Sequence, residues 1–261
     1  MVDVNDNGVP KPSMLFFFIS TTLYAVVKYN ISANNLRVAT LCYVITIIVG
    51  HYLINMNIVT AICKSSNWRL AFIVTVVPWV MMFSIIMIVL ELYPGWKAPF
   101  SNTFGYGLVK FSGAKKLMSE IFPPVEDQPE SDGAKSVKES LAYIYSDQSI
   151  LINEVTNENF ENFWKETEAI RSGKSTGADE ASLKYKFKKL VKLKDIVGEY
   201  VWYMLTGSLV IAVGYNYLVT VTCSPTVEDI RQQEISYEEE IENQDAEKEA
   251  NSSNEMQYRG I

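Results

Sequence analysis

The chain has 261 residues, of which 48% are hydrophobic and 20% charged, and its formal net charge is −7. Its mean hydropathy of +0.05 is unremarkable, but long apolar runs fill residues 13–93 and 200–222, while the middle and the C-terminal end hold most of the charge. This segregation excludes an ordinary single-core soluble globule and indicates a membrane protein. The acidic balance gives no support to nucleic-acid binding.

The negative charge is concentrated at the C-terminal end of the chain. Residues 224–261 contain eleven Asp and Glu against three Lys and Arg, a net of −8, so the remainder is close to neutral. We expect residues 223–261 to form an acidic disordered tail. Residues 1–12, which are polar and include two prolines, predict a short disordered lead.

Four segments are apolar and close to the length that a bilayer requires, about 20 residues at 1.5 Å rise. They are residues 13–29, 36–54, 69–93 and 200–222. The first is the shortest and contains Ser20, Thr21 and Thr22, so it either spans as a short tilted helix or lies flat in the interface. The pattern predicts three transmembrane helices within residues 13–93 and a fourth at 200–222.

The polar region between the third and fourth segments, residues 94–199, predicts a small helical extramembrane domain. Apolar residues recur at helical spacing in 136–152 and 156–171, as expected for amphipathic helices with one buried face. Residues 181–199 predict a lysine-rich helix that continues directly into the last span. The predicted fold class is therefore all-α, a polytopic helical membrane protein with about four transmembrane helices.

The charges that flank the spans predict the orientation. Lys28, Arg37, Lys97 and the lysine-rich helix all fall on the side of the extramembrane domain. Because positive charge near span ends favours the cytosolic side, we expect residues 94–199 to face the cytosol.

The sequence shows no pattern typical of catalysis, of a metal site or of a cofactor. The only histidine, His51, lies near the end of the second segment, where we expect it at the membrane interface. The string SGKST at 172–176 resembles the end of a phosphate-binding loop, but Glu168 stands where that loop needs glycine and a helix is predicted before it. We therefore predict a non-enzymatic protein without metal or cofactor.

Two stretches are candidates for contact with a membrane or a partner. The string GWKAPFSNTFGY at 95–106 contains Trp96, Phe100, Asn102 and Phe104, and its aromatic side chains are expected either to anchor the third span at the headgroup layer or to dock a partner. In the lysine-rich helix, Lys188, Lys189 and Lys192 are expected either to bind anionic headgroups or to form a solvated flank.

The cysteines allow one disulfide prediction. Cys63 and Cys223 fall on the same side of the membrane in the predicted topology, so a bond between them is expected if that side is an oxidising compartment.

The string GWKAPFSNTFGYG after a span, Phe163-Trp164 in the helical region and the string VKLKDIVGEYVWYMLTGSLVIAVGYNYLV before Cys223 together resemble a membrane protein of nucleocytoplasmic large DNA viruses that infect algae and amoebae. The resemblance implies an inner-membrane protein of an icosahedral virion, inserted in host endomembranes during assembly. It further implies a structural role as a minor capsid component, in which residues 94–199 tie the lipid bilayer to the capsid or to other minor capsid proteins.

Two further hypotheses stay open on the sequence. Ser, Thr and Asn side chains in the spans allow an oligomeric channel or a transporter. An assembly factor of cellular membranes also fits the same pattern. The sequence leaves the oligomeric state and the capsid protein contacted undetermined.

Overall fold

The computed structural model describes residues 11–63, 67–122, 142, 148–168, 171, 179–220, 230–232 and 234–241. Every regular element in these ranges is a helix, which confirms the all-helical fold class. The lead at 1–10, most of the helix predicted at 136–152, the string at 172–176 and most of the acidic tail lie outside the described residues. In the tail, residues 230–232 and 234–241 are helical, and disorder of the remainder stays a prediction.

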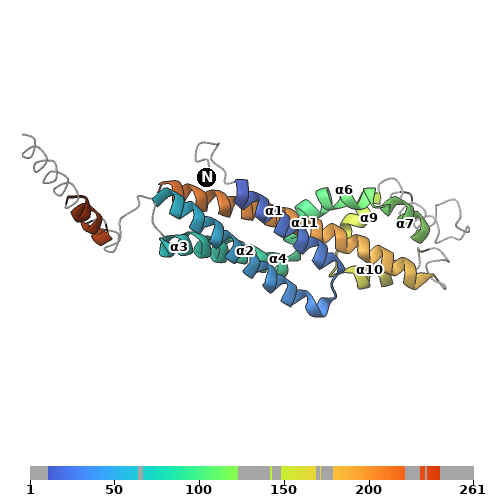
Figure 1. The fold of residues 1–261 in the computed structure, drawn as a ribbon. Helices are drawn as coiled ribbons and strands as arrows, with labels where there is room; N and C mark the ends of the chain where they lie inside the picture. The colour runs from blue at the N-terminus through green and yellow to red at the C-terminus, as the bar shows by residue number, and fades with distance from the viewer. Residues whose placement is uncertain are drawn as a thin grey trace, which may run out of the picture.

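One half of the molecule is a bundle of long apolar helices (Figure 1). It contains α1 (Lys11–Asn30), α2 (Ala33–Cys63), a continuous run made of α3 (Trp68–Pro78), η1 (Trp79–Phe83) and α4 (Ser84–Leu92), and the second half of α11 (Glu180–Thr220). Pro78 has no backbone N–H to donate, and the run passes it through the π-helical turn η1 rather than ending there. Apolar sequences of this length form helices because a helix satisfies its own backbone hydrogen bonds without water.

Three helices of the described residues are long and apolar enough to cross a membrane: Asn34–Cys63, Trp68–Leu92 and Glu180–Thr220. Helix α1 is not among them, so the predicted count of four spans stays a prediction. Nevertheless α1 packs along α11 in the opposite direction. Phe17 lies against Gly207, Thr22 bonds Tyr200 and the Lys192 amine reaches the carbonyl of Tyr29.

The other half is a cluster of short helices around the first half of α11 (Figure 1). After the bundle the chain forms η2 (Pro94–Lys97), α5 (Ala98–Phe100), η3 (Ser101–Gly105), α6 (Tyr106–Phe111) and α7 (Ala114–Ile121), and later α9 (Gln148–Glu154) and α10 (Phe160–Glu166). Their apolar faces enclose a core that includes Val109, Ile121, Phe160 and Trp164. This core is separate from the two apolar clusters of the bundle.

Helix α11 belongs to both halves. Its Phe187 and Val191 are buried in the core of the short helices, while Tyr203, Val210 and Leu218 are buried in the bundle. The lysine-rich helix therefore continues into the last apolar segment without a break, as the sequence predicts. One rigid element connects the two parts of the fold.

The two halves meet where η3 lies directly on α11. A Cβ atom on Gly198 of α11 would stand 2.7 Å from the backbone nitrogen of Ser101, and one on Gly105 of η3 would clash with the carbonyl oxygen of Lys194. Both obstructing atoms are backbone and cannot rotate away. The distinctive string at 95–106 thus contributes Gly105 to this close contact, and α11 contributes Gly198.

Substitution Gly198→Ala should therefore destabilise the junction by about 1–3 kcal/mol, because it overpacks a backbone contact. Thermal unfolding of the detergent-solubilised protein should show a Tm lowered by several degrees. Gly107→Ala is the matched control, since no atom lies within 4 Å of a Cβ at that helical position. That control should leave Tm unchanged or raise it, and an equal loss in both variants would contradict the close packing.

Candidate functional site

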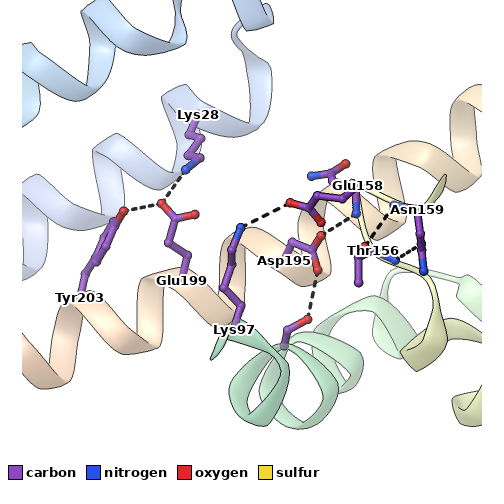
Figure 2. Close-up of polar contacts among 10 residues, drawn as sticks. Lys28, Lys97, Thr156, Glu158, Asn159, Asp195, Glu199 and Tyr203 are labelled. Carbon is purple, nitrogen blue, oxygen red and sulfur yellow. Dashed lines mark hydrogen bonds and ion pairs between the residues drawn. The ribbon is translucent and has the colours of Figure 1, made fainter. Parts of the chain in front are cut away.

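The most unusual polar cluster lies at the end of the bundle that faces the short helices. The Lys28 amine of α1 donates to the Glu199 carboxylate of α11 over 2.5 Å, and the Tyr203 hydroxyl donates to the same oxygen over 2.5 Å (Figure 2). The Glu199 side chain is 8% exposed, and that of Lys28 19%. A charge this far from water requires a partner, so this pair fixes the position of α1 along α11.

Tyrosine rings and threonine hydroxyls extend this cluster into the bundle. The rings of Tyr24 and Tyr43 stack 4.2 Å apart, and Tyr203 lies 6.3 Å from Tyr43. The Tyr43 hydroxyl pairs with Thr21 at 2.9 Å, and the Tyr24 hydroxyl pairs with Thr40 at 2.8 Å. These hydroxyl groups on α1 and α2 therefore hydrogen-bond to each other, as is common between packed membrane helices.

A second cluster lies one to two turns earlier on α11, where Lys194 is fully buried. Its amine donates to the carbonyl oxygens of Ile152 at 2.9 Å, Asn153 at 3.2 Å and Val155 at 2.8 Å, and lies 3.3 Å from the Asn102 amide oxygen. The three carbonyls belong to the C-terminal end of α9, where helix carbonyls lack partners and the helix dipole is negative. Lys194 therefore caps α9 and attaches it to α11.

The neighbouring Asp195 attaches the segment that follows α9. Its carboxylate, which is also buried, accepts from the Ser101 hydroxyl at 3.2 Å and from the backbone N–H of Asn157 at 2.9 Å (Figure 2). Asn157 lies in a turn in which Thr156 and Asn159 bond each other reciprocally, a capping arrangement that precedes α10. Lys194 and Asp195 together hold both ends of the α9–α10 connection.

Exposed ion pairs hold the far side of α10 to α11. The Glu161 carboxylate accepts from Lys184 at 2.6 Å and from Lys188 at 2.7 Å. Hydrogen bonds from Lys184, and then from Lys188, lower the pKa of Glu161 from 4.5 to about 2. The ion pairs to Lys184 and Lys188 therefore persist until the pH falls well below the ordinary pKa of a glutamate.

The aromatic residues of the string at 95–106 differ in exposure, and their predicted role stays a prediction. Trp96 and Phe104 are 54% and 62% exposed, and Phe100 packs edge-on against Trp202 with 5.1 Å between ring centroids. Trp202 also donates its indole N–H to the carbonyl of Trp96 at 2.7 Å. The aromatic residues thus flank the junction with α11, whereas Asn102 faces inward and contacts Lys194 instead of an external partner.

The three predicted lysines of α11 do not share one role. Lys188 pairs with Glu161 within the protein. Lys192 donates to the carbonyls of Tyr29 and Ile31 and so caps the end of α1. Only Lys189 lies beside an open pocket, with its amine over the Tyr29 and Tyr185 rings.

The expected position of His51 at the interface is wrong. His51 is 2% exposed, and α2 continues beyond it to Cys63. Its ring lies 4.5 Å from Trp79 and 5.3 Å from Phe16, and its Nδ1 is 2.8 Å from the carbonyl of Ile47. Helix α2 is longer than the apolar run that defines it in the sequence, which moves this residue into the middle of the bundle.

The cysteine pairing stays a prediction. Cys63 is disulfide-bonded and Cys42 is a free, exposed thiol. Cys223 lies outside the described residues.

Sequence reasoning missed the residues that join the halves, namely Lys28, Lys194, Asp195 and Glu199. A weak signal was present, because Asp195 and Glu199 are the only acids in the last turns of a lysine-rich helix and stand four residues apart, on one helix face. Their partners come from segments up to 171 residues away, which no local pattern identifies.

The arrangement offers charge pairing and helix capping. Among the described residues, no group of three or more His, Cys, Asp or Glu side chains could hold a metal ion. Comparison of the chain with protein-family models, curated proteins and solved structures finds no match. The viral resemblance therefore stays a prediction.

Replacing Lys194 with Met should destabilise the protein by about 3–5 kcal/mol, because the buried Asp195 carboxylate loses its adjacent cation and the α9 carbonyls lose their donor. Chemical unfolding in detergent, followed by circular dichroism, measures this loss. The control is Lys186→Met, which removes an exposed lysine from the same helix and should change stability little. A similar, small effect of both substitutions would contradict the capping role.

The lowered pKa of Glu161 predicts a pH dependence. A group whose pKa is lower in the folded state stabilises the fold above its ordinary pKa, and this stabilisation is lost as pH falls through the folded-state value. Wild-type protein should therefore lose its Tm advantage over Glu161→Gln between pH 4.5 and about 2. The control is Glu166→Gln on the same helix, whose Tm difference from wild type should not shrink over this pH range. A Tm difference between wild type and Glu161→Gln that does not change with pH would refute the pairing.

Proposed function

We propose that this protein is a non-enzymatic structural membrane protein that holds the helical region 94–199 at a fixed position beside a bilayer. The observation that carries the proposal is α11, one 41-residue helix that is buried in the core of the short helices and in the apolar bundle. A movement of one half therefore moves the other. Such a construction suits an anchor, since position is transmitted without a flexible linker.

We include α1 as a fourth span in this proposal. Its 20 residues reach about 30 Å, the thickness of the hydrocarbon layer. Leu15, Ile19, Leu23 and Val26 point away from the bundle and are between 48% and 61% exposed. A continuous apolar face of this kind is stable against lipid and costly in water. An even number of spans places the N-terminus and the acidic tail on the side opposite residues 94–199.

The packing inside the bundle favours an anchor over a channel. The threonines at 21, 22 and 40 bond tyrosine hydroxyls of neighbouring helices, and Asn55 bonds Thr75 at 2.8 Å. These groups are used in helix contacts rather than along a water-filled path. A purified anchor should be electrically silent in reconstituted bilayers.

The partner surface in this proposal is the outer side of η3 and α6. Phe104, Leu108 and Phe111 lie three to four residues apart on this side and are 62%, 44% and 89% exposed. Contiguous exposed apolar side chains are typical of protein contacts. On the resemblance to large DNA viruses, the partner is the capsid or another minor capsid protein, and many weak contacts to a lattice together give firm attachment.

Phe104→Ser with Phe111→Ser should abolish attachment without preventing membrane insertion. The measurement is mass spectrometry of purified particles before and after lipid removal with mild detergent, which shows whether the chain stays with the shell. Trp68→Ser, a similarly exposed aromatic at the other end of the bundle, should not alter retention. Release of the wild-type chain with lipid, its absence from particles, or a conductance in reconstituted bilayers would overturn the proposal.

A further inference from the structure

A pocket of about 400 Å³ opens where α1, α7 and α11 meet. Its lining includes Tyr29 at the end of α1, Lys116 and Glu120 on α7, and Tyr185, Lys186 and Lys189 on α11, together with the turn before α7. Gly113 has φ +89°, a left-handed conformation that lets the chain turn sharply at the rim. Nothing in the junction described above uses this pocket.

The charge of the pocket favours an anion. Three lysines line it against one acid, Glu120. The Lys189 amine lies 5.6 Å from the Tyr29 ring and 5.1 Å from the Tyr185 ring, which hold it at the pocket wall. Lys192 follows one turn later with its amine on the α1 carbonyls, so positive charge is concentrated on this side of α11.

The position of the pocket favours a lipid as the source of that anion. Tyr29 is in the last turn of α1, directly after the outward-facing Val26 and Val27, which are 55% and 46% exposed. A bilayer that covers those apolar side chains ends at the level of Lys28 and Tyr29. The pocket therefore opens beside the headgroup layer.

We propose that this pocket binds the phosphorylated headgroup of an anionic lipid, with the amines of Lys116, Lys186 and Lys189 around the phosphate. Tyr29, Tyr185 and Ser112 line the same pocket, and side chains of this hydroxyl-bearing kind suit a polyol ring that carries the phosphate. A pocket of this volume exceeds what a phosphate ion alone needs and lies within the usual range for small ligands. The inference rests on the proposed insertion of the bundle in a bilayer and not on the proposed capsid attachment.

The test is calorimetric titration of the full chain in a neutral detergent with dioctanoyl phosphatidylinositol 4-phosphate. Dioctanoyl phosphatidylcholine, inositol 1,4-bisphosphate and inorganic phosphate are the comparison ligands. The phosphoinositide should bind more tightly than all three. At about fivefold per basic residue, Lys186→Gln with Lys189→Gln should weaken its binding about 25-fold.

The control is Lys184→Gln with Lys188→Gln, which removes the same charge from the same helix but from the side that faces Glu161. It should weaken binding far less than the pocket variant. Glu120→Gln removes the acid and should strengthen binding severalfold, a gain that misfolding cannot produce.

Equal losses in the two lysine variants would overturn the proposal in favour of diffuse attraction, as would equal affinity for phosphatidylcholine. Equal affinity for inositol 1,4-bisphosphate or inorganic phosphate would overturn the lipid assignment in favour of a soluble phosphate. The Phe104→Ser with Phe111→Ser variant should bind the phosphoinositide normally, so failure of the capsid proposal is distinguishable from failure of this one.

Discussion

The fold depends on the close contact between η3 and α11. Gly105 and Gly198 let the two backbones approach, and the adjacent Lys194 and Asp195 are buried by that approach. Burial without partners would be prohibitive for both charges, so the contact also requires the α9 carbonyls and the Asn157 N–H to be in place. Close packing and the hydrogen bonding of the buried charges therefore depend on each other, and the short helices take their position from this junction.

A chain that passes from water into lipid on one helix must change its side-chain chemistry within a few turns. Along α11 the side chains change in steps. The first lysines are solvated, and Lys192 and Lys194 then donate hydrogen bonds to backbone carbonyls. Nearest the bundle, Glu199 forms an ion pair with Lys28. Lys192, Lys194 and Glu199 each have a polar partner inside the protein. These internal partners allow one rigid helix to serve both environments, which is the property that the proposed anchoring role uses.

The predictions from sequence succeeded where a local pattern is enough to define a helix. They failed where the position of a residue depends on where a helix ends or on a partner that is distant in the sequence. Helical periodicity predicted α10 and the continuous α11, and composition predicted the three helices that are long and apolar enough to cross a membrane. The apolar run at 36–54 underestimated α2, and so misplaced His51. Lys188, Lys189 and Lys192 looked equivalent in sequence, yet their neighbours on α10, α7 and α1 give them different roles.

The sequence by itself determined that the protein is all-helical and has helices suited to a membrane, because apolar length and periodicity act within one segment. Only the tertiary structure decided which charges are buried. Lys28 and Glu199 lie 171 residues apart in the sequence. The structural role of the string at 95–106 follows only from its contact with α11. The free energy of a buried charge depends on which atoms surround it, and those atoms come from segments that only folding brings together.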